Sequence, residues 1–210
     1  FLQKWVVRRL IHQLQPSVVH TSNPTYGEML KRSGIVASEL PLFGNVPLAT
    51  CDREWFGQGM RDRGIPLDHL SRDTFWLGAI FGSIHPQWTA RPWLDDLCAA
   101  ASGSGRRLVI IQIGHTPNSG LEVWEKIKSG FTGKCDFVSF GGQSPDRIST
   151  MLQMLDFGIS TSPGALVGKS GTVATMLEHG LPVLVTRDDW QPRGWKVNRS
   201  HHDPLVVFAR

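Results

Sequence analysis

Short apolar runs alternate with amphipathic segments along most of this 210-residue chain. From residue 73 onward the alternation is regular, and each apolar run is followed by a glycine-rich or polar loop. The pattern predicts strands over 74–81, 108–113, 136–140, 157–160, 182–186 and 204–209, and helices over 93–101, 121–129, 144–154 and 171–178. Alternation of this kind is typical of a doubly wound parallel sheet with right-handed crossovers.

The first part of the chain contains two further steps of the same kind. The apolar spacing predicts helices over 1–14 and 26–33 and strands over 17–20 and 35–42. Residues 46–72 are rich in proline, glycine and charge and have weak periodicity, so we expect an irregular connection there. The fold class is therefore α/β, with a partial amino-terminal lobe (1–50), a linker (51–72) and a Rossmann-like carboxyl-terminal domain (73–210).

In such a sheet the loops at the carboxyl ends of the strands meet at one crevice. These loops are 82–86, 114–119, 141–143, 161–172 and 187–190. The stretch 157–186 is a strand, a small-residue loop, a helix and a strand. A helix that starts near Gly171 turns unpaired N–H groups and a positive dipole end toward an anion, with Lys169 beside it. We interpret this stretch as the phosphate-facing part of a nucleotide or nucleotide-sugar site.

Residues 163–170, PGALVGKS, come close to a phosphate-binding P-loop. That motif requires a glycine where Pro163 stands, and Gly164 is one position too close to the Gly-Lys-Ser end. An NTPase is therefore one alternative, and it predicts ATP hydrolysis that depends on magnesium.

A longer stretch resembles a known family. LEHGLPVLVTRDD (177–189), preceded by GKSGT (168–172) and by a strand ending in LDFGIST, resembles the donor-binding domain of GT-B glycosyltransferases, especially the retaining, glycogen-synthase-like group. QPSVVHTSNPTYGEMLKR is similar to a strand and helix of their amino-terminal domain. The resemblance covers roughly 15–45 and 73–190. It implies transfer of a sugar from a nucleotide-diphosphate sugar to an acceptor hydroxyl.

The resemblance also implies roles for particular residues. The second of the family's two glutamates, which holds the donor ribose, falls on Glu178, and the first falls on Ser170, where this chain departs from the pattern. Lys169 would supply charge for the diphosphate, so Lys169 and Ser170 are the catalytic candidates. In the loop where the family carries basic residues, this chain offers Arg91 and His85.

The donor-binding candidates share a place on the loops that would face the diphosphate or the ribose. The pairs Gly82–Ser83 and Gly171–Thr172 would contribute backbone N–H groups. The full set of donor-binding candidates is Gly82, Ser83, His85, Gly171, Thr172 and Glu178. We expect neither a metal nor a cofactor, because the nucleotide sugar is a substrate and the helix-end amides with Lys169 would balance its charge.

Two further functions remain open at this point. An epimerase acting on nucleotide sugars would use the same crevice but needs a carboxylate acid/base pair, for which Asp188 and Asp189 are the candidates. A non-catalytic binding or accessory protein would bind the donor without turnover.

The charge and cysteine content of the chain limit the classes of binding partner that we expect. The net charge of +4 is a mild excess that suits anionic substrates or a peripheral contact with a lipid surface, and the basic residues form no stripe with aromatics that would favour nucleic acid. Three distant cysteines suggest a reducing compartment, hence the cytoplasm. His201, His202 and Asp203 lack a spaced partner, so we expect no metal site there.

Overall fold

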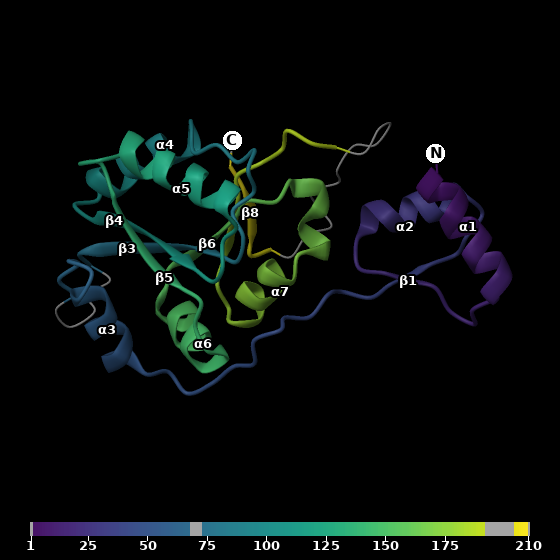
Figure 1. Cartoon of the computed structure of the whole chain (residues 1–210), viewed down its shortest axis with the longest axis horizontal. Helices are drawn as coiled ribbons and strands as arrows, with labels where there is room; N and C mark the ends of the chain where they lie inside the picture. Colours follow the sequence, from purple (N-terminus) through teal and green to yellow (C-terminus); the bar gives the residue numbers. More distant parts are fainter. Residues whose placement is uncertain (1, 68–72, 192–203, 210) are drawn as a thin grey trace.

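The computed structural model describes residues 2–67, 73–191 and 204–209 (Figure 1). The helices are α1 (Leu2–Leu14), α2 (Pro24–Lys31), α3 (Arg53–Arg61), α4 (Trp93–Gly103), α5 (Asn118–Gly130), α6 (Pro145–Met154), the 3-10 helix η1 (Gly164–Lys169) and α7 (Gly171–Glu178). The strands are β1 (His20–Thr21), β2 (Ser38–Glu39), β3 (Phe75–Phe81), β4 (Arg107–Ile113), β5 (Asp136–Gly141), β6 (Phe157–Ser160), β7 (Val183–Val185) and β8 (Val206–Phe208).

The main sheet contains six strands in the order β5-β4-β3-β6-β7-β8, and every neighbouring pair is parallel. Counted from β3, this order is 3-2-1-4-5-6, the arrangement of doubly wound nucleotide-binding folds. The predicted Rossmann-like α/β fold is confirmed, including the last strand within 204–209. The strand order reverses between β3 and β6, so the chain leaves these two neighbours toward opposite faces of the sheet.

Helices cover both faces of this sheet (Figure 1). One buried cluster packs α4 and α5 against the sheet, through Trp93, Leu94, Trp124 and Ile127. The other packs α3, α6 and α7 against the opposite face, through Phe56, Met60, Met151, Val173 and Met176. Burial on both faces explains why the central strand β3, FWLGAIF, carries no polar side chain along its length.

Strand β4 shows how the sequence produces this arrangement. Its side chains alternate between the two faces, so Val109 and Ile111 enter one core while Leu108 and Ile110 enter the other. All four are buried. A continuous run of branched apolar residues therefore satisfies both layers, and the run was predictable as a buried strand.

The expectation of an irregular connection over 46–72 is wrong for its middle part. Residues 53–61 form α3, in which Phe56 and Met60 are fully buried one helical turn apart. Two glycines in the helix lower its intrinsic propensity, and one of them, Gly59, allows the ring of Phe140 to approach within 2.8 Å of where a Cβ would lie. Packing against the sheet and α6 therefore stabilises a helix whose local signals, the N-cap Asp52 and the apolar pair Phe56 and Met60, are weakened by these glycines.

The chain ahead of α3 is bound along the surface of α6 and α7. Ser149, Thr150 and Thr175 are buried polar residues on these helices, and their hydroxyls face this extended segment. The backbone N–H groups of Gly44, Asn45, Ala49 and Asp52 donate to side-chain oxygens of Glu178, Thr175, Ser149 and Thr150, at distances of 2.9, 3.1, 2.9 and 3.1 Å. Residues 44–52 are thus fixed to the carboxyl-terminal domain by side-chain hydrogen bonds.

The amino-terminal elements α1, β1, α2 and β2 form a small α/β unit. β1 and β2 pair in parallel over two residues each, which is shorter than the strands predicted over 17–20 and 35–42. A two-residue ladder has few bonds, and its side chains lack a full layer on either face. The division into a lobe, a linker and a domain stays a prediction. Among the described residues, no helix is both long and apolar enough to cross a bilayer.

Candidate functional site

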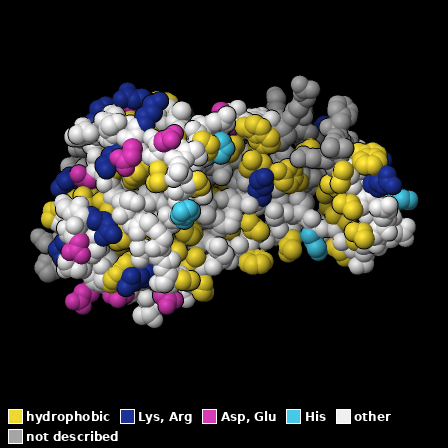
Figure 2. Space-filling model, in the orientation of Figure 1, with side chains coloured by type: hydrophobic (Ala, Val, Ile, Leu, Met, Phe, Trp, Pro, Cys, Tyr) yellow, Lys and Arg dark blue, Asp and Glu magenta, His cyan; other side chains and the backbone are white. Residues whose placement is uncertain are grey.

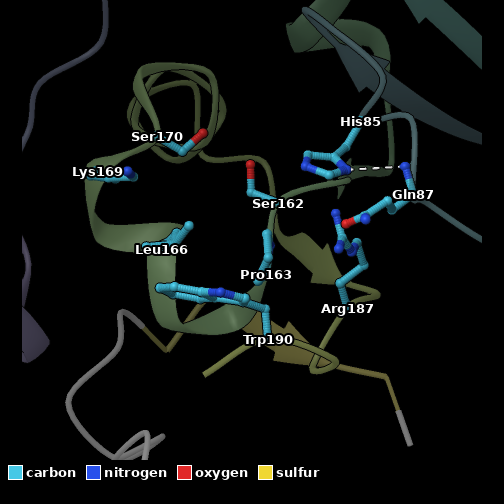
Figure 3. Close-up of a pocket in the computed structure, with 9 residues that line it drawn as sticks. All are labelled: His85, Gln87, Ser162, Pro163, Leu166, Lys169, Ser170, Arg187 and Trp190. Carbon is cyan, nitrogen blue, oxygen red and sulfur yellow. Dashed lines mark hydrogen bonds between the residues drawn. The ribbon is translucent and has the colours of Figure 1, made fainter. Parts of the chain in front are cut away.

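A cavity of about 370 Å³ opens at the carboxyl ends of β3, β6 and β7, where the strand order reverses (Figure 3). Ligands of open α/β sheets bind at such switch points. The loop after β3, the segment from β6 to the start of α7, and the loop after β7 each contribute to its wall. The lining residues are His85, Gln87, Ser162, Pro163, Leu166, Lys169, Ser170, Arg187 and Trp190.

Thr161 ties the two central loops together across the switch point. Its hydroxyl accepts a hydrogen bond from the backbone N–H of His85 at 3.3 Å and donates to the carbonyl of Ser83 at 3.2 Å. Gly82, at a φ of +89°, comes so close to α7 that a Cβ there would lie 2.8 Å from the Cγ2 of Thr172. The predicted pairs Gly82–Ser83 and Gly171–Thr172 therefore lie beside each other near the switch point, but none of these four residues lines the cavity.

Lys169 and Ser170 stand where η1 passes into α7. Ser170 is the N-cap of α7, and its hydroxyl accepts the N–H of Val173 at 3.4 Å and shares a hydrogen bond with the hydroxyl of Thr172 at 3.0 Å. The ammonium of Lys169 lies 5.8 Å from the ring centre of Tyr26 and is exposed to solvent at the cavity wall. A cation therefore stands beside the positive end of a helix, a combination that attracts anions.

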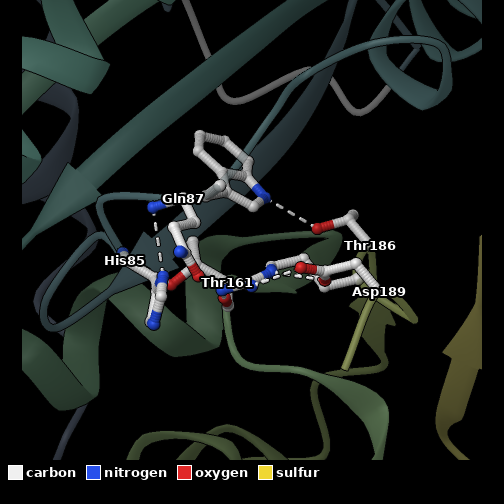
Figure 4. A network of polar contacts seen from close by, with 7 residues as sticks. His85, Gln87, Thr161, Thr186 and Asp189 are labelled. Carbon is white, nitrogen blue, oxygen red and sulfur yellow. Dashed lines mark hydrogen bonds and ion pairs between the residues drawn. The ribbon is translucent and has the colours of Figure 1, made fainter. Parts of the chain in front are cut away.

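Arg187 also lines the cavity and was not among the candidates from the sequence. Its side chain is 4% exposed and forms a two-pronged pair with Asp189, with Nε–Oδ1 and Nη2–Oδ2 distances of 2.8 and 2.6 Å (Figure 4). Nη1 also donates to the carbonyl of Thr161 at 3.4 Å. The paired guanidinium keeps the pKa of Asp189 below its ordinary value. A basic residue directly after a buried strand, in a loop expected at the crevice, was the available signal.

His85 faces the same cavity from the loop after β3. Its Nδ1 accepts the backbone N–H of Gln87 at 3.1 Å. Burial and then the nearby Arg187 lower the pKa of His85, while the weaker influence of Asp189 acts in the opposite direction. The ring is therefore neutral near pH 7.

Glu178 lies apart from this group. It is at the far end of α7, exposed to solvent, and its Oε1 accepts the N–H of Gly44 at 2.9 Å. It lines a second cavity of about 440 Å³, which shares Ser170 with the first. The structure thus brings His85, Lys169 and Ser170 together and leaves Glu178 in the neighbouring space, and its ribose-binding role stays a prediction.

Other candidates from the sequence are placed outside the cavity. Arg91 is well exposed and pairs with Asp95 at 3.4 Å. The loops 114–119 and 141–143 contribute none of the described lining residues. His201, His202 and Asp203 lie outside the described residues. Within the described ranges, no group of three or more His, Cys, Asp or Glu side chains is arranged to hold a metal.

The structure argues against two of the alternatives. In the P-loop-like stretch, the N–H groups of Gly164, Leu166 and Ser170 donate to backbone carbonyls, whereas a P-loop turns its N–H groups toward phosphates. For the epimerase, Asp189 is held ionised by Arg187, which makes it a poor proton donor.

Comparison with known proteins gives fold-level relatives. No protein-family profile and no curated protein sequence matches the chain. Among solved structures, HepE of Anabaena in complex with UDP and glucose is similar at a TM-score of 0.54 and 14% identity, over 87% of this chain and 47% of HepE. HepE with UDP alone is similar at a TM-score of 0.51 and 14% identity, over 81% and 44%.

A third solved structure, the carboxyl-terminal domain of a glycosyl transferase group 1 family protein (LpcC) from Francisella tularensis, has 12% identity over 80% of this chain and 79% of that one. Its TM-score is 0.43. The chain spans about half the length of HepE. At these identities the likeness shows the fold, which is similar to that of GT-B glycosyltransferases.

Proposed function

We propose that this chain binds the diphosphate of a nucleotide sugar in the cavity at the switch point and takes part in transferring the sugar to an acceptor hydroxyl. The observation that carries the proposal is the pairing of two cations, Lys169 and the buried Arg187, on opposite walls of one cavity beside the start of α7. Backbone N–H groups and cations that are already in place stabilise the charge that develops on a leaving diphosphate. The shared fold with HepE, whose structure contains UDP and glucose, supports this proposal.

The position of each residue in the cavity determines the role that we assign to it. Lys169 is exposed and can follow the diphosphate, whereas Arg187 is held in place by Asp189 and offers a fixed charge. Ser170 and Thr172 occupy the start of α7, where the positive end of the helix dipole lies beside the cavity that Ser170 lines. Orientation of the donor by Glu178 through its ribose remains part of the proposal, since Ser170 connects the two cavities.

The test has two parts. Thermal unfolding with UDP, ADP, GDP and their sugars identifies the nucleotide, because a ligand that binds the folded state raises Tm. Transfer of labelled sugar to added acceptors then separates an enzyme from an accessory protein, which would show the Tm shift without turnover. If none of these nucleotides changes Tm or is bound in calorimetry, the proposed function is wrong.

The finer assignment to the retaining, glycogen-synthase-like group, with a hexose as the transferred sugar, rests on the resemblance of LEHGLPVLVTRDD and is part of this proposal. Proton NMR of the anomeric centre of the product decides it. Retention of the donor's anomeric configuration is the expected result.

We also propose that the amino-terminal unit contacts an anionic membrane surface, on the cytoplasmic side that the free cysteines favour. Residues 1–36 carry five of the 22 basic and one of the 18 acidic side chains, so the rest of the chain is neutral. Along α1, Trp5, Val6, Leu10 and Leu14 are exposed, and Figure 2 shows hydrophobic side chains beside Lys and Arg on this part of the surface. A basic helix with an apolar face is suited to a lipid interface.

A further inference from the structure

The two ring nitrogens of His85 have different surroundings. Nδ1 accepts the backbone N–H of Gln87 at 3.1 Å, so it must carry a lone pair (Figure 4). In a neutral imidazole the other nitrogen then carries the proton. The hydrogen bond from Gln87 therefore selects the tautomer with Nε2–H, and because the donor is a main-chain group it does not depend on the rotamer of any other side chain.

The ring is also held in position. The backbone N–H of His85 donates to the hydroxyl of Thr161, which in turn donates to the carbonyl of Ser83, so the backbone that leads into His85 is tied to the residue after β6. In Figure 3 the remaining ring nitrogen points toward Ser162, into the cavity. A fixed N–H donor thus projects into the space between the two cations.

The charged groups around His85 disfavour the protonated, positively charged form of its ring. Arg187 from the loop after β7 and Lys169 from η1 line the same cavity, and Asp189 is the carboxylate that faces His85. Burial and Arg187 lower the pKa of His85, and Asp189 offsets this only in part. A second proton would also have to sit on Nδ1, where it would meet the N–H of Gln87.

We propose that His85 binds the donor substrate as a neutral hydrogen-bond donor, through Nε2–H to a non-bridging oxygen of the diphosphate. In this role it neither accepts a proton from the acceptor hydroxyl nor supplies a positive charge. The inference rests on the proposed function, because it names how one residue of that same site meets the nucleotide sugar. It gives the cavity a neutral directional contact between the cations Lys169 and Arg187.

Two substitutions separate the ring nitrogens. In His85→Gln the amide nitrogen reaches about as far as Nε2, whereas in His85→Asn it reaches only as far as Nδ1. By calorimetry with UDP, we expect His85→Gln to bind within about threefold of the unsubstituted protein and His85→Asn to bind about tenfold more weakly, the effect of losing one hydrogen bond to a charged group. Thermal unfolding without ligand shows that both variants are folded.

A pH series between 7 and 8.5 distinguishes the neutral donor from a cation. We expect a UDP affinity that is independent of pH in this range, for the unsubstituted protein and for His85→Gln. An affinity that falls with rising pH in the unsubstituted protein but not in His85→Gln would show a cationic histidine and overturn the proposal. Equal affinities of the Gln and Asn variants would also overturn it. If the unsubstituted protein itself binds no nucleotide, the proposed function fails first.

Discussion

Replacement of Arg187 by methionine tests the site most directly, because Arg187 was found from the structure and Arg91 was suggested by the sequence. Methionine keeps much of the aliphatic volume and removes the charge and its five N–H groups. The guanidinium is 4% exposed and makes hydrogen bonds to Asp189 and Thr161. Its loss therefore lowers the free energy of unfolding and the free energy of nucleotide binding by different amounts, and each can be estimated separately.

The cost in stability is modest. Asp189 is 54% exposed, so water screens its pairing with Arg187 and solvates the carboxylate when the partner is removed. Such pairs contribute up to about 1 kcal/mol, and the lost hydrogen bond to the carbonyl of Thr161 adds about 1 kcal/mol. For a chain of this size, a loss of about 1–2 kcal/mol lowers Tm by about 2–8 °C. Arg187→Met is therefore expected to fold.

The cost in binding is larger. A hydrogen bond from a charged donor to an anion contributes about 1.5–3 kcal/mol, which corresponds to about ten- to 150-fold in Kd. Calorimetry with UDP on the unsubstituted protein, Arg187→Met and Arg91→Met measures it. Arg91→Met is the matched control, because it removes the same groups from an exposed arginine paired with Asp95 outside the cavity.

The UDP affinities of the two variants, compared with each other, show whether the diphosphate binds at Arg187. We expect weak binding by Arg187→Met and unchanged binding by Arg91→Met. If Arg187→Met binds UDP within twofold of the unsubstituted protein, the diphosphate does not reach this cavity wall. If Arg91→Met is the weak binder instead, the assignment from the family pattern is right and the cavity is the wrong site.

Three other variants extend these tests. Glu178→Ala is expected to weaken nucleotide-sugar binding in calorimetry with little change in Tm, because its contact with Gly44 is exposed; unchanged affinity would remove Glu178 from the site. Asp189→Asn is expected to destabilise the protein by up to about 1 kcal/mol at pH 7. Since Arg187 lowers the pKa of Asp189 in the fold, that stabilisation is present above the unfolded pKa of about 4 and disappears as pH falls through the folded value, so unfolding curves of the two proteins should converge in acid. Leu10→Asp on α1 is expected to reduce flotation with phosphatidylserine vesicles, and equal flotation would exclude this helix as the contact.

The layers of the fold were predictable because most strands are visible in the sequence as short apolar runs. In β4, the neighbouring residues Ile110 and Ile111 point to opposite faces of the sheet, and both are apolar. Such a run indicates a strand buried on both faces, even when the elements that cover it are not known. Helix α3 carries weaker local evidence, the N-cap Asp52 and apolar residues one turn apart, in a segment with two glycines. Its two buried side chains, Phe56 and Met60, are buried because they pack against residues that are distant in the sequence.

The location of the cavity was predictable from the sequence, and its lining residues were predictable only in part. The carboxyl ends of the strands identify the crevice, and Lys169 with Ser170 lies there as expected. Arg187 was missed because a charged residue is buried only when a partner accompanies it, and the pairing with Asp189 depends on how the chain turns after β7. The separation of Glu178 follows from helix geometry, since seven residues of α7 carry it about 10 Å from Gly171.

The hydrogen bonds along residues 44–52 also decide where the chain can bend. The last bond of the amino-terminal unit joins the N–H of Leu40 to Thr21, and the next fixed point is Gly44. Within the described chain, residues 41–43 carry none of these bonds, so any rotation of the amino-terminal unit relative to the sheet would have to occur in this connection of about 10 Å.

A connection this short restricts any swing of the amino-terminal unit. Asn23 of that unit donates to the carbonyl of Ala165 in η1 at 2.8 Å, and Tyr26 lies against Lys169. A rotation about residues 41–43 must therefore pull on η1 or break these two contacts. A rotation that keeps these contacts would move η1, and with it the ammonium of Lys169, relative to the guanidinium of Arg187, whereas a rotation that breaks them would leave Lys169 in place.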